Sequence, residues 1–403
     1  MDIKNLTSRN FFRCLESDYS ELNINVKIPS DIKFAIKMGL QPVDAKCDKC
    51  NGVRKISYRK GTNSVYFRCH KCNLNSSAFD GTFKGKFGKV SWGTIFAFIW
   101  HLICIDSSLK SSCLAVAVSC TTGVDWANFI RHAMMVSLIN LTSLKIGGPG
   151  KTVEIDDTVV SKQKCKKGRK VKETKWVVGG ICREDKNCFL CFVNDRSETT
   201  LNWVVSKFVQ TGSTIYTDKW KGYNHIDDLE GIQIKHETVK HAKNFVNPLN
   251  GVHTQSIKRL WGLLKNQKNL PTHYTEELCD SYLYAFMYKK FLKWGSLKPG
   301  ERFEIFCQHL SKIYPGAGRV PEWKEPETVS AVPGVIPKRA SGVKRQKEEP
   351  AVPEVIPKRA SGVKRQKEEK CCRSVKKQLL MKKDNTEVCE CNTLSKQHAK
   401  VDE

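Results

Sequence analysis

Four cysteines are spaced as two pairs of metal ligands. Cys47 and Cys50 form one Cys-x-x-Cys unit, and Cys69 and Cys72 form another, with eighteen residues between the two units. Two residues between paired thiolates allow a tight turn that directs both sulfur atoms at one ion. Residues 53–69 predict a hairpin that brings the units together. We therefore expect a zinc ribbon with a structural Zn²⁺, which leaves no open coordination position for catalysis. Four unligated thiols are the alternative.

Two aspartates lie where the residue pattern predicts β-strands. Asp156 lies within TVEIDDTVV, residues 152–160, and Asp218 directly follows the predicted strand 214–217. Because side chains alternate along a strand, Asp156 and Asp157 are expected on opposite faces. Carboxylates from neighbouring strands suit a pair of divalent ions about 3.5 to 4 Å apart, which can transfer a phosphodiester. Asp156 and Asp218 could hold Mg²⁺ or Mn²⁺ in this way, but an aspartate after a strand, taken alone, more often forms a turn or a helix cap.

The strand pattern continues after the first aspartate. The runs at 176–183 and 188–195 are also rich in β-branched and aromatic residues, and a basic loop at 162–175 separates them from the first strand. Short connections join consecutive strands antiparallel, so these runs predict the antiparallel start of a mixed α/β sheet.

The chain carries an excess of positive charge. Its 403 residues, 40% of them hydrophobic, are enough for two or three domains with cores. A formal net charge of +27 favours a polyanionic partner, because lysines and arginines that neutralise phosphates release counterions. A solvated basic surface or a membrane-surface binder would be the alternatives. With no visible secretory signal, the protein is expected to be intracellular, and its eighteen cysteines to be mostly free thiols or metal ligands.

The apolar run 95–105 is too short to cross a bilayer, which needs roughly 20 residues. We expect it to form a buried helix. No membrane partner and no small-molecule substrate are expected.

Three segments carry motifs of one family. They are EIDD at 154–157, IYTDKWKGY at 215–223 and VHTQSIKRLWGLLK at 252–265. Together they resemble the Merlin-type DNA transposons of eukaryotes and their bacterial ISXO-like insertion-sequence relatives, over roughly residues 30–300. The resemblance implies a ribonuclease-H-like α/β core in which Asp156 and Asp218 are the first two catalytic acids. It also implies cut-and-paste transposition, double-stranded DNA at transposon ends as the partner, and assembly of a homodimer or larger oligomer.

The third catalytic position of that family falls on Lys258. The family has an acid there, or an amide in some clades, and a basic residue seven positions later, which Lys265 matches. The segment predicts a helix that Thr254 caps and whose buried stripe is spaced at helical intervals. The stripe consists of Ile257, Leu260, Trp261 and Leu264. An ammonium would repel the divalent ion, since two positive unit charges about 4 Å apart already repel by about 4 kcal/mol at an effective dielectric of about 20. Normal two-metal catalysis is therefore not expected.

Another acid would have to replace the missing carboxylate for the site to work in the usual way. Glu237 precedes the helix, and Glu276 and Glu277 follow it, so none of them shares the helical face of Lys258. We expect impaired catalysis, and a rearranged site that uses one of these acids is the alternative.

A helical region is expected between the cysteines and the first acid. Residues 91–146 have a helical period, and 111–130 resembles a helix-turn-helix with Cys120–Gly123 as its turn. An ordinary helical hairpin explains this pattern equally well. The glycines in 147–150 mark the boundary to the next domain.

The C-terminal residues differ in composition from the rest. From 315 to 403 we expect a disordered basic tail, in which a twenty-residue unit occurs at 331–350 and again at 351–370 with two differences. Its PKR and VKRQK clusters resemble nuclear-localisation signals and also suit DNA phosphates, so a nuclear location is expected. A tail that only solvates the protein is the alternative.

These patterns predict four regions: an N-terminal region 1–90 with the ribbon at 47–72, helices at 91–146, a transposase-like core at 150–300, and the tail. Candidate DNA contacts are Lys162, Lys164, Lys219 and Lys265. The predicted function is that of a transposon-derived DNA-binding protein with impaired catalysis. The alternatives are an active transposase and a domesticated nuclear DNA-binding or chromatin-associated protein.

Overall fold

The structure is a computed structural model that describes residues 3–17, 19, 22, 28–62, 64–161, 175–239, 253–267 and 276–324. The chain divides into two units, 1–337 and 338–403, and every described residue belongs to the first. The predicted DNA contacts Lys162 and Lys164 and the repeats of the predicted tail lie outside the described residues.

The N-terminal part of the chain contains a small antiparallel sheet in the order β1-β2-β3-β4. Its strands are β1 (Asp44–Lys46), β2 (Val53–Arg59), β3 (Ser64–Cys69) and β4 (Asn75–Ser77), and η3 (Lys60–Thr62) joins β2 to β3. The pairing of β2 with β3 confirms the predicted hairpin, because it sets Arg54 opposite Cys69 and so brings the two cysteine units to one end of the sheet.

Helices precede and follow this sheet along the chain. They are η1 (Ile3–Asn5), α1 (Ser8–Glu16), α2 (Ser30–Lys37), η4 (Phe83–Phe87), α3 (Trp92–Ile99), the π-helical turn η5 (Trp100–Cys104), α4 (Leu109–Ala115) and α5 (Cys120–Leu141). The predicted buried helix at 95–105 is confirmed, since α3 and η5 form a continuous run that is buried at nearly every position. No single helix of the described chain is long and apolar enough to cross a membrane, and α4 with α5 passes that test only as a bent pair.

The pair α4 and α5 has the geometry of a helix-turn-helix. Their axes are bent by 109°, and the four residues 116–119 join them. The predicted turn at Cys120–Gly123 was wrong, because the Ser119 side chain accepts a hydrogen bond from Thr122 N and so starts α5 at Cys120. Gly123 lies against Cys113, where a Cβ would have no room, so this glycine marks a close approach of the two helices.

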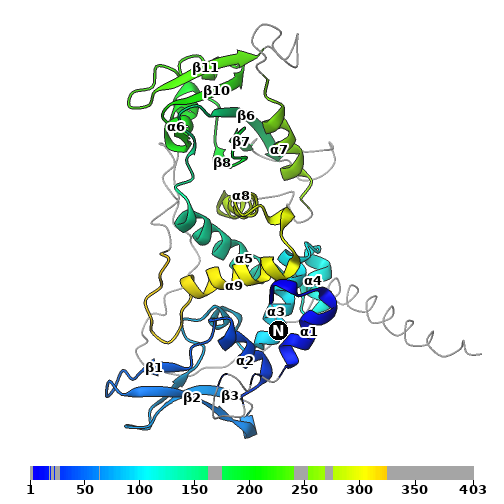
Figure 1. Ribbon diagram of the computed structural model, residues 1–403, viewed down its shortest axis with the longest axis vertical. Coiled ribbons are helices and arrows are strands. Elements are labelled where there is room, and N and C mark those ends of the chain that lie inside the picture. Colours follow the sequence, from blue (N-terminus) through cyan, green and yellow to red (C-terminus); the bar gives the residue numbers. More distant parts are fainter. Residues whose placement is uncertain are drawn as a thin grey trace, which may run out of the picture. The chain divides into compact units, whose positions relative to one another are not determined.

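A five-stranded mixed sheet forms the second part of the fold (Figure 1). Its strands are β6 (Thr152–Ser161), β7 (Lys175–Cys182), β8 (Cys188–Val193), β10 (Ser213–Asp218) and β11 (Ile234–Val239). The first three form an antiparallel meander, β10 joins β6 in parallel and β11 joins β10 in parallel, in the order β11-β10-β6-β7-β8. The predicted antiparallel start of a mixed sheet is confirmed. A short parallel pair, β5 (Ile146–Gly147) with β9 (Val209–Gln210), lies outside it.

Helices cover both faces of this sheet. They are α6 (Glu198–Phe208), the turn η6 (Lys221–Tyr223), α7 (Gln255–Lys265) and α8 (Glu276–Phe291). Phe189 of β8 pairs with Gly180 of β7, which in turn pairs with Ile155 of β6, so these residues lie on one face of the sheet. Phe208 of α6 stacks on Phe189, so α6 covers that face. On the opposite face, α7 contacts β6 and β7, and α8 contacts β8. The sheet therefore has α6 on one side and α7 with α8 on the other.

The C-terminal helices connect the sheet to the N-terminal helices. They are α8, η7 (Trp294–Ser296) and α9 (Pro299–Ile313), and both α8 and α9 pack on α5. Tyr284, Phe286 and Tyr288 of α8 are buried and pack in the core. Trp323 is also buried, with its ring centroid 5.0 Å from that of His309, so the packed part of the chain extends beyond 315, where the tail was predicted to begin.

The start of α7 is held by a carboxylate from β6. Glu154 is fully buried, and its Oε2 accepts a hydrogen bond from the Ile257 backbone N–H at 3.0 Å. Its Oε1 pairs with Arg183 Nε at 2.6 Å, and Arg183 also donates to the carbonyl of His253 at 2.7 Å. Thr254 occupies the predicted N-cap position of α7, but its side chain makes no capping hydrogen bond, because its φ of −124° and ψ of 41° differ from the extended backbone of a typical cap residue.

Glu154→Gln should lower the free energy of unfolding by about 2–4 kcal/mol, because it leaves the mostly buried Arg183 guanidinium without its anionic partner. Chemical denaturation followed by tryptophan fluorescence measures the change. The control is Asp185→Asn, which removes a more exposed ion pair with Lys151 and should cost less than about 1 kcal/mol. Equal, small losses in the two variants would contradict the anchoring role of Glu154.

Candidate active site and metal centre

The structure brings the four cysteines together. The sulfur atoms of Cys47, Cys50, Cys69 and Cys72 all lie within 4.8 Å of one another, with Cys47 and Cys72 at 3.6 Å and Cys50 and Cys69 at 3.4 Å. Tetrahedral Zn²⁺ with bonds of about 2.3 Å would set its sulfur atoms about 3.8 Å apart. The backbone N–H of Cys72 is the largest influence lowering the pKa of Cys69 to about 6, which favours the thiolate that a metal binds. The cluster can therefore hold a metal ion.

The two cysteine turns share one backbone conformation. Asn51 and Asn73, which directly follow the turns, are left-handed with φ of 54° and 57°, and each donates its N–H to the carbonyl of the first cysteine of its turn at 2.9 Å. Asparagine tolerates this region better than most residues. The repeated Cys-x-x-Cys-Asn sequence thus encodes two equivalent turns.

The two candidate acids lie on neighbouring strands and on one face of the sheet. Tyr216 of β10 pairs with Glu154 of β6 in the parallel register. Asp218 lies two residues after Tyr216, and Asp156 lies two residues after Glu154. Side chains paired in this way project to the same face. Burial raises the pKa of Asp156 to about 6, and the charges of Asp218 and Asp157 act in the same direction. The two carboxylates therefore lie within each other's electrostatic field.

Each acid is oriented by an N–H group. The Trp261 indole of α7 donates to Asp156 Oδ2 at 3.2 Å, and the Trp220 backbone N–H donates to Asp218 Oδ1 at 3.1 Å. Trp261 reaches Asp156 because Gly179 of β7 lies below its ring, where a Cβ would be 2.5 Å from the indole. The helical pattern placed Trp261 only in the buried stripe, since nothing local in the sequence indicates its polar contact with Asp156.

Asp157 points to the other face, as the alternation predicted, and has its own cation. Arg196 Nη1 lies 3.1 Å from Asp157 Oδ2. The guanidinium carbon of Arg196 lies 3.7 Å from the ring centre of Trp176 and 4.2 Å from that of Trp220. Neither this arginine nor Arg183 was predictable from local pattern, because each lies just beyond a strand and pairs with a carboxylate on a distant segment.

The third position is occupied by an exposed lysine. Lys258 lies three residues before Trp261 and seven before Lys265 on α7, so the three share a helical face. Trp261 and Lys265 contact β6 from that face, whereas Lys258 is exposed and forms no ion pair with any residue that the structure describes. Of the acids considered as replacements, Glu237 is on β11 and pairs with Lys235 at 2.7 Å, and the side chains of Glu276 and Glu277 are outside the described residues.

Asp156 and Asp218 have the right chemistry for Mg²⁺, but among the described residues they do not form part of a group of three close ligands. Asp156 and Asp218 offer the oxygen ligands that Mg²⁺ prefers. In the described ranges, however, the four cysteines form the only group of three or more potential ligands with close donor atoms. The buried Tyr223 hydroxyl has no hydrogen-bond partner among the described residues, although burial, Asp157 and Asp156 raise its pKa well above the ordinary range. Water, free or bound to an ion, would satisfy this hydroxyl beside the acids.

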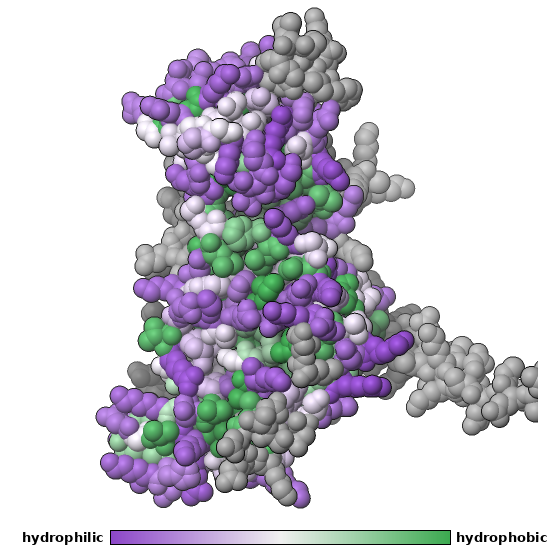
Figure 2. Space-filling view, in the orientation of Figure 1, coloured by the Kyte–Doolittle hydropathy of each residue, from purple (hydrophilic) through white to green (hydrophobic). Residues whose placement is uncertain are grey.

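The predicted DNA contacts have different surroundings. Lys219 is exposed beside Asp218, whereas Lys265 donates to Thr158 Oγ1 of β6 at 2.6 Å. Figure 2 shows hydrophilic side chains over much of the five-stranded sheet and hydrophobic side chains at the level of α8. Roles for these lysines in DNA binding stay predictions.

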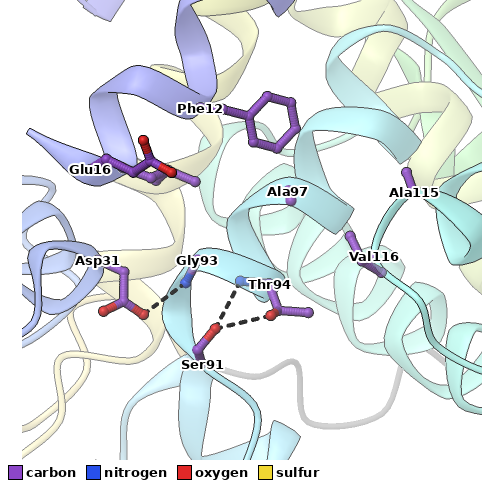
Figure 3. A pocket seen from close by; sticks show the side chains of 10 residues that line it. Phe12, Glu16, Asp31, Ser91, Gly93, Thr94, Ala97, Ala115 and Val116 are labelled. Atoms are coloured by element: carbon purple, nitrogen blue, oxygen red, sulfur yellow. Dashed lines mark hydrogen bonds between the residues drawn. The ribbon is translucent and has the colours of Figure 1, made fainter. Parts of the chain in front are cut away.

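A separate pocket of about 360 Å³ lies in the N-terminal part, between side chains of α1, α2, α3 and α4 (Figure 3). Phe12 borders it, and Asp31 accepts a hydrogen bond from the Gly93 N–H at 3.0 Å. That bond satisfies a free N–H in the first turn of α3, so Asp31 has a structural role there. None of the predicted site residues lines this pocket.

Comparisons with known proteins place a family signature on the sheet. Residues 147–290 match the sequence model of the ISXO2-like transposase domain. No curated protein matches the chain.

Two viral structures are similar to part of the chain. In the cryo-EM structure of the simian T-cell lymphotropic virus intasome in complex with PP2A regulatory subunit B56 gamma, 36% of this chain aligns with 49% of the matched chain at 13% identity and a TM-score of 0.24. The HTLV-2 integrase catalytic core domain in complex with magnesium (trimeric form) aligns over 35% of this chain and 85% of its own, at 13% identity and a TM-score of 0.23. The chain spans about half the length of the first.

Asp156→Asn should stabilise the folded protein at neutral pH. The folded-state pKa of about 6 exceeds the unfolded value of about 3.9, so folding stability falls as pH rises between these values and the full loss is present above pH 6. We expect the variant to gain about 1–3 kcal/mol at neutral pH and much less near pH 4. Thermal melts across this range test it. The control is Asp125→Asn, at an exposed position of α5, whose stability change should not depend on pH in this way. A stability gain of Asp156→Asn that is independent of pH would contradict the electrostatic explanation.

Proposed function

We propose, on the premise that residues 147–290 are an ISXO2-like transposase domain, that the protein is transposon-derived, binds DNA and has impaired strand-cleavage chemistry. One observation carries the proposal: two oriented aspartates, Asp156 and Asp218, face a helix whose family acid position is Lys258. The order of the strands, a meander with two parallel strands added beside its first strand, supports the ribonuclease-H-like core that the resemblance implies.

In this proposal Asp156 and Asp218 hold divalent metal. Bound Mg²⁺ would activate the attacking oxygen and stabilise the leaving oxygen of a phosphodiester. The Trp261 N–H holds one oxygen of Asp156 by a hydrogen bond, and the Trp220 backbone N–H holds one oxygen of Asp218. The Lys258 ammonium opposes the ion, because it adds a positive charge where the family supplies a negative one.

An active transposase is the second candidate function. It is favoured by the exposure of Lys258, whose long side chain has no ion-pair partner in the described part of the chain and can turn away from the acids. A domesticated nuclear DNA-binding protein would retain the same fold without the chemistry, and the basic clusters of the C-terminal repeats support it.

The metal of the cysteine cluster is, in our proposal, structural Zn²⁺. Four thiolates in a closed tetrahedral set fit zinc and leave no position for a substrate. The ion would join the two turns that flank the β2–β3 hairpin, so folding of this small sheet would depend on it.

Cys69→Ser should remove about one zinc ion per chain and lower the melting temperature, because a site with three thiolates binds zinc far more weakly. Elemental analysis of the purified protein measures the zinc. Cys120→Ser is the matched control, since Cys120 is exposed and outside the cluster, and it should leave the zinc content unchanged. Equal zinc content in the wild type and Cys69→Ser would rule out this site.

Lys258→Glu should strengthen Mn²⁺ binding at the acids at least about tenfold, because it replaces a repulsive charge with a ligand. Electron paramagnetic resonance of free Mn²⁺ measures binding, and nicking of supercoiled plasmid measures strand cleavage. Arg259→Glu makes the same change of charge at the next exposed position, about 100° around α7, and should have little effect.

The wild type should show no nicking, and Lys258→Glu should gain nicking that Asp156→Asn removes again. Nicking by the wild type that Asp156→Asn abolishes would instead establish the active transposase. If Lys258→Glu and Arg259→Glu bind Mn²⁺ equally well, position 258 does not face the metal site.

A further inference from the structure

Trp220 is an exposed aromatic residue that is fixed in position beside an acid. Trp220 is 40% exposed, which is unusual for so large an apolar residue in a packed fold. Its backbone N–H donates to Asp218 Oδ1 at 3.1 Å, and its indole N–H donates to the carbonyl of Arg196 at 3.3 Å. Both ends of the residue are therefore held, although the ring is open to solvent.

One face of the Trp220 ring is already covered. The Arg196 guanidinium lies between Trp176 and Trp220, and Asp157 holds it by an ion pair. Since the inner face of Trp220 rests on this cation, its exposed area belongs to the outer face and the ring edge. A flat ring that is already ordered can bind another flat ring at little further cost in conformational entropy.

The charges beside Trp220 favour a polyanion. Lys219 and Lys221 flank it in sequence, both are exposed, and neither forms an ion pair with any residue in the described ranges. An aromatic platform between lysines is the arrangement by which proteins bind unpaired nucleotides: the bases stack on the ring while the phosphates contact the cations.

We propose that the outer face of Trp220 stacks on an unpaired base of DNA next to Asp218. The inference rests on the proposed function, and it adds that the site receives a melted or single-stranded DNA end. The bases of a duplex stack on one another, so a single exposed indole can stack on a base only where that base has left the duplex stack.

The test compares two probes of equal charge with the full-length protein. One is a fluorescein-labelled oligothymidylate of roughly 15 nucleotides, and the other has the same phosphate backbone without bases. Fluorescence anisotropy measures both affinities. Phosphate contacts anywhere in the chain contribute equally to the two probes, so the difference between them reports on base stacking.

Trp220→Leu should weaken binding of the oligothymidylate about fivefold to 140-fold, the range that stacking of one base supplies, and leave the abasic probe within about twofold. Trp220→Phe should keep most of the base-dependent affinity. Phe12→Leu is the matched control, because Phe12 is 42% exposed but lies on α1 in the N-terminal part, and it should bind both probes like the wild type. Thermal melts verify that each variant is folded.

Unchanged preference of Trp220→Leu for the probe with bases would overturn the inference and leave DNA binding intact. Failure of the wild type to bind either probe would overturn DNA binding as well, so the two failures are distinguishable. The ratio of the two affinities should also persist between about 50 mM and 200 mM salt, because salt weakens phosphate contacts and acts little on stacking. A ratio that falls to one at the higher salt would count against stacking.

Discussion

The site depends on a match in spacing between one helix and one strand. A step of four residues along a helix advances about 6.0 Å, and a step of two residues along a strand advances about 6.6 Å. Ile257, Trp261 and Lys265 of α7 therefore meet Glu154, Asp156 and Thr158 of β6 in turn. The buried Glu154 fixes the start of this series, and Gly179 leaves room for its middle member. One strand face thus provides the helix anchor and the first acid together.

This arrangement concentrates negative charge where little water reaches it. Asp156 and Asp157 of β6 and Asp218 at the end of β10 act on one another, and only Asp157 has an arginine as its partner among the described residues. Two carboxylates that are held close and left without a cation destabilise the folded chain, and a divalent ion would relieve this. In the proposed function the same charges give position 258 its importance, because its residue would add either an attractive or a repulsive charge for that ion.

Local patterns predicted the sheet, the cysteine hairpin and the buried stripe of α7, because each depends on alternation or periodicity within a short segment. Contacts between distant segments were not predictable in this way. Arg183 and Glu154 are 29 residues apart, and Asp157 and Arg196 are 39 apart. The start of α7 shows the difference. Thr254 is a residue type that often caps helices, but the Ile257 N–H donates instead to Glu154, which lies 103 residues earlier in the chain.

The exposure of Lys258 has a consequence for how such a gene changes over generations. An ammonium at Asp156 would be an unpaired charge beneath the Trp261 indole, and the protein would unfold or be degraded. At position 258 the same change faces water and costs the fold little. Under the proposed function, a single codon would therefore silence the chemistry and leave an intact protein. If that protein still occupies transposon ends, it would compete with working copies and restrain the spread of its own lineage.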